Sequence, residues 1–314
     1  MASGCPEKTA TTITRHLVDT SLCGIESHGL MRIVQYHEQF RDGYMDPLAQ
    51  PKVVENELGG RIVDGGGGSG ILAMELAYET GMKMAKSSGI SALGIRRVGH
   101  TGRHGAFADD AAAQGFLTLC IGGGNRHDWP QVAPYGGTKG ILPTNPWCAG
   151  VPGGDQGPVV MDFATSKMAG GWIYAAKSAG ADLPPGCVID SEGNATQNPD
   201  DYFNGGAILP AGEQKGYALA MVAEMIAEAM LGPATTECHW LLITLDTTRF
   251  REPCAMQAAA EEVLAEVRSC PPAPGFNRVE IPGERERQCR DRADGIIAVP
   301  ESTWDAILGL HDSL

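Results

Sequence analysis

The residue best placed for proton transfer in this sequence is a histidine between two glycines. His100 lies in the stretch IRRVGHTGRHG (95–105), directly after the apolar, strand-like segment GISALGI. A glycine-rich exit from a strand leaves room around the imidazole ring for a ligand, and the ordinary histidine pKa of about 6.5 suits a general acid or base. We therefore expect the other chemical groups of the protein to converge on His100.

A second group of functional side chains occurs in the segment CGIESHGLMR. Ser27, His28 and Arg32 fall within six residues of one another. If the chain is helical from Gly29 onward, His28 and Arg32 lie one turn apart on the same face, and the guanidinium could hold a carboxylate through two parallel hydrogen bonds. A solvated helix start with a capping serine accounts for the same residues equally well.

Two further polar residues are expected at the ends of regular elements. Asp162 ends the strand-like segment PVVMD, where it could accept hydrogen bonds from a ribose, orient a histidine, or cap a following helix that Thr165 and Ser166 also suit. Lys215 precedes a long apolar-periodic helix, and a cation there suits a phosphate or carboxylate. A plain surface lysine is the alternative.

A metal site is the alternative reading of the histidines. His100 and His104, with His127 and Asp128 on a later loop, are residue types that bind zinc or iron. The glycines between Thr101 and Gly105 argue against a helical His-x3-His pair, so we expect no metal. A metal-dependent hydrolase or lyase remains the rival from another enzyme class.

The elements that must position these residues alternate between strands and helices. Helices are expected at 6–22, 106–115, 216–231 and 254–267, and strands at 116–124, within 142–152, and at 158–162, 239–246 and 278–283. The segment 183–204 reads as a polar loop, and the charged run ERERQCRDR (284–292) as a solvated helix face.

A glycine run follows the strand-like segment RIVD. Gly65, Gly67 and Gly70 satisfy the GxGxxG pattern between a strand and a helix, as in a dinucleotide-binding Rossmann fold. The chain holds 42 glycines, and the next strand ends in Arg96 and Arg97 instead of an acidic ribose ligand. The glycine run is therefore compatible both with an NADP-binding Rossmann fold and with a simple turn before a helix.

Composition excludes several classes of protein. The chain has 314 residues and a formal net charge of −14, which disfavours nucleic-acid binding. No apolar run is long enough to span a membrane, and nine cysteines without CxxC spacing or a signal-like leader indicate a cytoplasmic protein. A small anionic substrate would need local cations, for which the candidates are Arg32, Arg96, Arg97, Arg103 and Lys215.

Several motifs, weak one by one, occur in a distinctive order: ESHGLMR, DGGGGSG, VGHTGRHGAF, APYGG, PTNPWCAGVP, MDFATS, LPAGEQKGYAL and IPGERE. In this order they resemble, over nearly the whole chain, the malate/L-lactate dehydrogenase family of the sulfolactate and ureidoglycolate dehydrogenase type. The resemblance implies interconversion of 2-hydroxy and 2-oxo acids with NAD or NADP, or in some branches reduction of cyclic imino acids such as pyrroline- or piperideine-2-carboxylate. An inactive homologue that only binds ligands is the non-enzymatic alternative.

The resemblance also implies a fold and an assembly. The expected fold is α/β, with a mixed-sheet cofactor lobe distinct from the Rossmann fold and flanked by helical substrate-binding segments, and homodimers are expected. The glycines at 65–70 then become a structural turn. We expect three segments: a helical substrate-binding segment at 1–57, a cofactor-binding and catalytic core at 58–232, and a C-terminal segment at 233–314 that packs back on the core.

Roles carry over from the family motifs by position. His100 matches the general acid/base, and Ser27, His28 and Arg32 match a catalytic cluster in which Arg32 clamps the substrate carboxylate. The expected substrate-binding residues also include Gly124 and His127. The expected cofactor-binding residues are Asp162, Phe163, Ala164, Lys215, Gly283, Glu284 and Arg285.

The sequence departs from the family pattern in three places. Val98 and Gly99 stand before His100 where Ser-Asn is usual, and Pro143 begins the PTNP motif where glycine is usual. The loop at 122–130 looks longer than usual, and its His127 and Trp129 are candidates for setting specificity. The chain also starts inside what is normally the second helical element, so a shortened N-terminus is expected.

Overall fold

The computed structural model describes residues 3–312 and divides the chain into two compact units built from alternating segments. Unit 1 contains Met1–Cys120, Cys148–Asp162 and Leu242–Leu314, and unit 2 contains Ile121–Trp147 and Phe163–Leu241. The division of the chain at 57 and 232 by role stays a prediction.

A seven-stranded sheet is the main β-structure, with the strand order β1-β2-β3-β10-β4-β5-β6. The first pair is antiparallel and the second parallel, so the sheet is mixed, as expected, and the Rossmann alternative is wrong. The strands are β1 (Lys52–Glu55), β2 (Arg61–Asp64), β3 (Ile90–Val98), β4 (Phe116–Gly123), β5 (Trp147–Gly154), β6 (Gly157–Phe163) and β10 (Cys238–Asp246).

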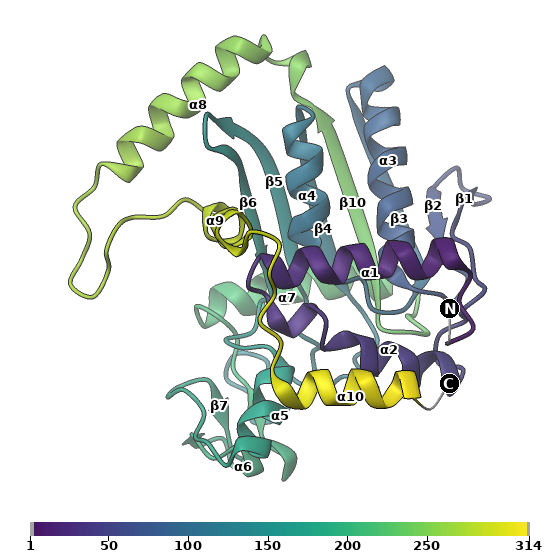
Figure 1. The fold of residues 1–314 in the computed structure, drawn as a ribbon, viewed down its shortest axis with the longest axis vertical. Coiled ribbons are helices and arrows are strands. Elements are labelled where there is room, and N and C mark those ends of the chain that lie inside the picture. Colours follow the sequence, from purple (N-terminus) through teal and green to yellow (C-terminus); the bar gives the residue numbers. More distant parts are fainter. Residues whose placement is uncertain (1–2, 313–314) are drawn as a thin grey trace. The chain divides into compact units, whose positions relative to one another are not determined.

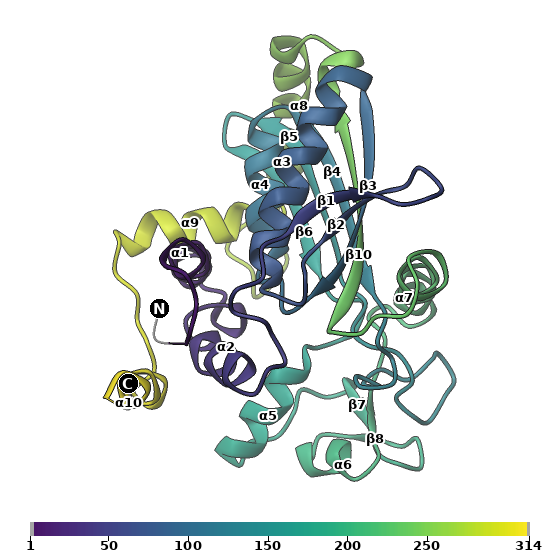
Figure 2. The same ribbon diagram turned by 90° about the vertical axis from the view of Figure 1, so that its right-hand side faces the viewer.

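Helices pack on the strands of unit 1. The helix α3 (Gly70–Ser88) lies against β3 and against α4 (His104–Ala113), as Figures 1 and 2 show. Its apolar residues recur at helical spacing, so one face that includes Ile71, Met74 and Tyr78 is buried. The remaining helices of this unit are α1 (Glu7–Leu22), the 3-10 helix η1 (Glu26–His28), α2 (Arg32–Arg41), the 3-10 helix η3 (Thr247–Arg249), α8 (Pro253–Arg268), α9 (Glu284–Ala293) and α10 (Glu301–Asp312).

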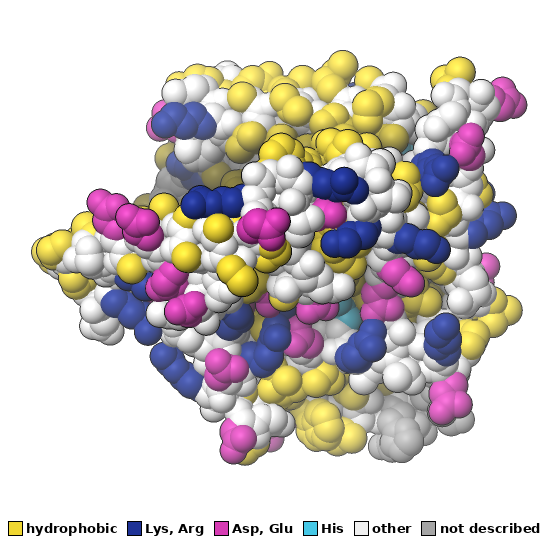
Figure 3. All heavy atoms as spheres, turned by 90° about the horizontal axis from the view of Figure 1, so that it is seen from above, with side chains coloured by type: hydrophobic (Ala, Val, Ile, Leu, Met, Phe, Trp, Pro, Cys, Tyr) yellow, Lys and Arg dark blue, Asp and Glu magenta, His cyan; other side chains and the backbone are white. Residues whose placement is uncertain are grey.

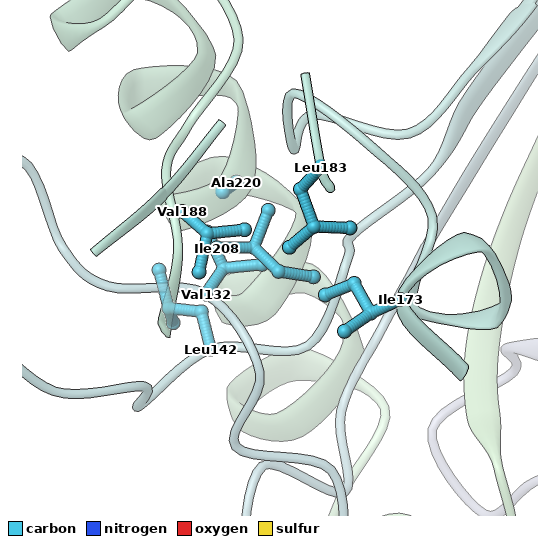
Figure 4. Close-up of a cluster of buried hydrophobic side chains, with 7 residues drawn as sticks. All are labelled: Val132, Leu142, Ile173, Leu183, Val188, Ile208 and Ala220. Atoms are coloured by element: carbon cyan, nitrogen blue, oxygen red, sulfur yellow. The ribbon is translucent and has the colours of Figure 1, made fainter. Parts of the chain in front are cut away.

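Unit 2 has a small core of its own, shown in Figure 4. The buried side chains are Val132, Leu142, Ile173, Leu183, Val188, Ile208 and Ala220. The segment expected to be a polar loop contributes β7 (Val188–Ile189), β8 (Ala195–Thr196) and α6 (Pro199–Phe203), and β9 (Ala207–Ile208) completes the sheet β8-β7-β9. The other helices are α5 (Gly170–Ala179), α7 (Gln214–Glu224) and the π-helix η2 (Met225–Met230).

Two expected elements differ in the structure. The segment at 278–283 is not a strand: the Val160 N–H donates to the Pro282 carbonyl, and a ladder cannot continue through a proline that lacks an N–H. The helix after Asp162 begins only at Gly170, and its N-cap residue is Ala169, which has no polar side chain to cap it. The Thr165 hydroxyl, expected as a cap, donates to the Thr144 carbonyl.

The charged helix α9 is not a solvated face, contrary to the prediction. Glu284 is only 5% exposed and pairs with Arg268 at 2.6 Å. Arg287 pairs with Asp109 at 2.8 Å, and Arg290 pairs with Asp19 at 3.1 Å. These ion pairs attach α9 to α8, α4 and α1, so the charged side chains of α9 hold this helix against its neighbours.

Charged side chains of both signs lie on the face of the molecule drawn in Figure 3. On the face shown in Figure 3, positive and negative side chains are interspersed and form no continuous basic area. Within residues 3–312, no helix combines the length and the apolar character needed to cross a membrane.

Candidate active site

The loop that carries His100 is held by the backbone of the glycine run. β2 and β3 are parallel neighbours, so the turn after β2 lies beside the end of β3. The amides of the run are therefore used inside the protein and do not form a phosphate cradle. The bonds are Gly65 N–H to Arg96 O (2.9 Å), Gly67 N–H to Arg97 O (2.8 Å), Gly99 N–H to Gly68 O (2.8 Å) and Gly70 N–H to His100 O (3.2 Å).

Glycine is required on both sides of His100. A Cβ at Gly99 would overlap the thioether of Met45, which is fully buried. Gly102 has φ +73°, a left-handed conformation that disfavours side chains, and a Cβ there would overlap the ring of His16. These contacts fix the backbone that presents the imidazole.

The ring of His100 is half-buried and contacts two aromatic rings. Its Nδ1 lies 2.6 Å from the hydroxyl of Tyr36 and accepts the Gly102 N–H at 3.2 Å. The ring centroid of His28 lies 5.2 Å from that of His100. The two histidines expected at the centre of the site are therefore neighbours in unit 1.

Ser27, His28 and Arg32 also meet, although not in the expected helical geometry. His28 ends η1 and α2 begins only at Arg32, so the two residues do not share a helical turn. The Arg32 Nε instead donates to the Ser27 carbonyl at 2.6 Å, and a second guanidinium nitrogen donates to Gln35. The Ser27 hydroxyl lies 2.9 Å from the His28 Nδ1.

The surroundings keep these imidazoles neutral. Burial, followed by the positive charge of Arg32, lowers the pKa of His28 to about 3. Burial and then the charges of Arg32 and the neighbouring histidines hold the pKa of His100 well below its usual range. A free imidazolium is therefore disfavoured at neutral pH.

The far side of the His100 loop is anchored to α1. His16 Nε2 accepts the Arg103 N–H at 2.9 Å, and the Arg103 guanidinium pairs with Asp19 at 2.9 Å. Arg103 is only 7% exposed, so it is a structural ion-pair partner and not a cation available to a substrate. Arg97 likewise pairs with Asp64 at 3.1 Å.

Asp162 caps a helix other than the one that follows it in the chain. One carboxylate oxygen accepts the Gly105 N–H at 2.6 Å, in the first turn of α4. The residue as a whole is exposed, whereas burial of its carboxyl group raises the pKa of Asp162, against the opposing effects of the Gly105 hydrogen bond and the charge of Arg103.

Gly283, Glu284 and Arg285 start α9. Gly283 has φ +93° and precedes the first helical residue. The Glu284 carboxylate accepts hydrogen bonds from Arg268 and from the Ile281 N–H at 3.0 Å. Arg285 is exposed. Of this group, Arg285 has the exposed side chain that a ligand could reach.

In unit 2, Gly124 is held by a buried carboxylate. Its N–H donates to Glu224 Oε2 at 2.9 Å, and the Asn145 side-chain amide donates to the same oxygen at 2.8 Å. Glu224 is 6% exposed. His127, three residues after Gly124, is exposed on the loop.

Phe163, Ala164 and Lys215 also belong to unit 2, where Phe163 is 42% exposed. Lys215 is exposed in the first turn of α7, whose N-terminal end has no side-chain cap. The Lys215 N–H donates to the Gly212 carbonyl at 3.2 Å, so it is the exposed ammonium, at the positive end of the helix, that suits a phosphate such as that of a nicotinamide cofactor.

Two histidines of the metal alternative, His100 and His104, are hydrogen-bonded to other groups of the protein. Within residues 3–312, no group of three or more His, Cys, Asp or Glu side chains is arranged to hold a metal ion. The Nδ1 of His100 is hydrogen-bonded as described, and the His104 Nε2 lies 2.7 Å from the Thr101 hydroxyl.

Three residues with structural or chemical roles were not predicted: Tyr36, His16 and Glu224. Tyr36 had a signal, because it lies four residues after Arg32 and therefore on the same face of a helix. His16 and Glu224 occur within ordinary amphipathic helices, and only the folded chain brings them to the His100 loop and to Gly124, respectively.

Comparison with known proteins gives consistent matches along the chain. The family model for malate/L-lactate dehydrogenase matches residues 1–308. An L-lactate dehydrogenase from Cupriavidus necator is 31% identical over 327 residues, covering 100% of this chain and 93% of that protein. A Delta(1)-pyrroline-2-carboxylate/Delta(1)-piperideine-2-carboxylate reductase from Pseudomonas putida is 33% identical over 229 residues, which cover 73% of this chain and 66% of that protein. The structure of the sulfolactate dehydrogenase from Methanocaldococcus jannaschii superposes with a TM-score of 0.86 at 27% identity, covering 99% of this chain and 92% of that one.

Proposed function

Because this chain belongs to the malate/L-lactate dehydrogenase family, we propose that it transfers a hydride between a nicotinamide cofactor and C2 of a small 2-hydroxy or 2-oxo acid. The family is one of dehydrogenases, so the chain is an oxidoreductase by membership. The observation that carries the proposal is the cluster in unit 1 where the rings of His28 and His100 lie 5.2 Å apart.

In this proposal, His100 exchanges the proton at the substrate heteroatom. A positioned acid or base contributes about 10²- to 10⁴-fold in rate. The Nε2 of His100 makes no hydrogen bond within residues 3–312, which leaves this nitrogen for a substrate oxygen. His28, oriented by Ser27, is assigned to the same oxygen or to the nicotinamide edge.

Arg32 is assigned to the substrate carboxylate. Its guanidinium is oriented by the Ser27 carbonyl and by Gln35, and its charge is felt by both His28 and His100. A cation fixed beside the acid/base group suits a small anion in a protein whose net charge is −14. Gly124 and His127 are proposed to contact the substrate.

NAD or NADP is the proposed cofactor, and its nicotinamide supplies or accepts the hydride when bound. The exposed ammonium of Lys215 at the start of α7 suits a phosphate, and the carboxylate of Asp162 can accept a hydrogen bond from a ribose hydroxyl. Phe163, Ala164, Gly283, Glu284 and Arg285 complete the proposed cofactor-binding set. For Glu284, the carboxylate is paired and the N–H donates to the Ile281 carbonyl at 3.0 Å, so its place in this set rests on the family motif.

A cyclic imino acid is the second candidate substrate. The relative from Pseudomonas putida is named a reductase of pyrroline- and piperideine-2-carboxylate. The same carboxylate clamp and proton donor would serve a C=N bond at C2. A homodimer and a cytoplasmic location are further proposals that rest on the family and on composition.

Oxidation of NADH and NADPH with a panel of 2-oxo acids and cyclic imino acids tests this function. We expect turnover with at least one acid, and we expect His100→Ala to reduce it. Cofactor binding without turnover on any acid would favour a binding homologue. Stoichiometric metal with chelator-sensitive hydrolysis would favour the metal-dependent alternative.

A further inference from the structure

The hydrogen bond between Tyr36 and His100 bears on how the proposed acid/base group works. Tyr36 is 3% exposed, and its hydroxyl lies 2.6 Å from the Nδ1 of His100. This contact joins α2 to the end of β3 across 64 positions of sequence. It is the shortest hydrogen bond of the His100 ring.

A backbone amide settles which nitrogen of His100 carries the proton. The Gly102 N–H points at Nδ1, at 3.2 Å, and an amide N–H can only donate. Nδ1 therefore presents its lone pair, and the neutral ring carries its proton on Nε2. The Tyr36 hydroxyl, bonded to the same Nδ1, must also be a donor.

In this state the ring can lose a proton from Nε2 only if Nδ1 gains one. The ring does not store a second proton in advance, because burial and the charge of Arg32 keep its pKa well below the usual range. Tyr36 is the donor already in place to supply Nδ1.

Arg32 can stabilise the tyrosine after it gives up its proton. Arg32 and Tyr36 are four residues apart on α2 and so lie on one face of the helix. A guanidinium there offsets the charge of a phenolate.

We propose that Tyr36 and His100 move the proton as a pair, without forming an imidazolium. The proposal rests on the proposed function. In the reducing direction, negative charge develops on the substrate oxygen, the Nε2–H bond breaks and an O–H bond forms on the substrate. At the same time the Tyr36 O–H bond breaks and an Nδ1–H bond forms, which leaves a phenolate.

The resting state then returns with one solvent proton. Nε2 takes a proton from water and Nδ1 returns its proton to the phenolate, so one proton is consumed for each oxo acid reduced. Oxidation runs the same steps in reverse. Tyr36 acts through His100 and needs no contact with the substrate.

The first experiment measures the ¹⁵N shifts of the His100 imidazole in the wild-type protein at neutral pH. We expect an unprotonated Nδ1 and a protonated Nε2. A proton on Nδ1 overturns the proposal whether or not the protein turns over any acid, so this result is separate from a failure of the proposed function.

The second experiment compares the pH profiles of kcat for reduction in the wild type and in Tyr36→Phe, with whichever acid is turned over. We expect Tyr36→Phe to lower kcat about 10²-fold near neutral pH, with less than about a threefold change in substrate KM. Because the variant must use an imidazolium, its kcat should rise as pH falls, whereas that of the wild type stays flat from about pH 6 to 8.

The other titratable groups that face His100 keep the same charge over this pH range, so they do not alter the pH profile of kcat. The pKa values of His28 and His104 are about 3 and that of His16 about 4, so these rings stay neutral over the range, and Arg32 stays charged. Tyr174→Phe is the matched control, since that tyrosine is 59% exposed on α5 and its variant should keep the wild-type profile. A Tyr36→Phe variant with the wild-type kcat, or with a lower kcat but an unchanged pH profile, overturns the proposal.

Discussion

The N–H of Gly70, the first residue of α3, donates to the carbonyl oxygen of His100 at 3.2 Å. The start of a buried helix is thereby bonded to the backbone of the proposed acid/base residue. The glycine run that resembles a dinucleotide fingerprint supports the His100 loop by its backbone and by its lack of side chains.

Gly70→Ala should both destabilise the protein and slow its turnover. An added Cβ would lie 2.9 Å from the His100 carbonyl oxygen and 2.6 Å from the Thr101 methyl group, so the loop must shift. We expect a loss of about 1–3 kcal/mol in the free energy of unfolding, measured with urea, and a lower kcat. Gly171→Ala is the control, because nothing lies within 4 Å of its Cβ in the first turn of α5. Equal effects of the two changes would contradict this role for Gly70.

His100→Ala should separate chemistry from cofactor binding. The substitution removes the proposed proton donor while leaving Lys215 and Asp162 in place, so we expect kcat to fall by about 10²- to 10⁴-fold with a cofactor Kd close to that of the wild type. Stopped-flow turnover and cofactor fluorescence titration measure the two quantities. Near-native turnover would remove His100 from the assignment.

Lys215→Ala should weaken cofactor binding and leave the chemical step nearly unchanged. Loss of the ammonium at the start of α7 removes a contact that we propose holds a cofactor phosphate in every state of the reaction, so we expect a cofactor KM about tenfold higher and a nearly unchanged kcat. Lys215→Arg should retain most of the affinity. An unchanged cofactor KM in the alanine variant would show that Lys215 is an ordinary surface lysine.

Local patterns predicted much of the fold and of the unit 1 site. Apolar periodicity indicated the helix at 6–22 and the strand before His100, and both are present as α1 and β3. Proximity of His28 to His100 depends on tertiary packing, and the ordered motifs supplied that expectation through the family resemblance.

Predictions failed where tertiary partners decide the structure. The charges of α9 look like a solvated face until Asp19 and Asp109 provide partners from other helices. Arg103 was predicted to be a cation available to an anionic substrate, but it forms an ion pair with Asp19. Capping of the following helix was one of the alternatives for Asp162, yet the helix that it caps is α4, which precedes it by some 50 residues of sequence.

The stability of unit 1 should fall on mild acidification because buried histidines must stay neutral. Burial lowers the pKa of His16 to about 4 and that of His104 to about 3. The unfolded chain takes up these protons below about pH 6.5 while the folded chain does not, so stability is full above that pH and falls towards pH 4. We expect the imidazoles of His16 and His104 each to lower the free energy of unfolding by about 2 kcal/mol at pH 5, measured by urea unfolding.

His16→Gln provides the comparison for this pH effect. A glutamine oxygen can accept the Arg103 N–H that His16 Nε2 accepts now, and it does not titrate. The variant should therefore lose less stability than the wild type between pH 7.5 and pH 5. Identical losses in the two proteins would mean that His16 is not one of the groups responsible.

Glu224→Ala should disturb the loop at 122–130 more than its helical neighbour does. The carboxylate of Glu224 accepts the Gly124 N–H and the Asn145 amide on one buried oxygen, and removing it leaves both donors without that partner. We expect a loss of about 2–4 kcal/mol in unfolding free energy. Substrate KM should also rise, because Gly124 is a proposed contact. Glu228→Ala is the matched control one turn later, since its partner Arg126 is 42% exposed and the pair is worth less than about 1 kcal/mol. Glu224→Gln, which keeps an acceptor oxygen, should fall between the two, and a Glu224→Ala protein as stable as Glu228→Ala would show that the buried carboxylate does not hold this loop.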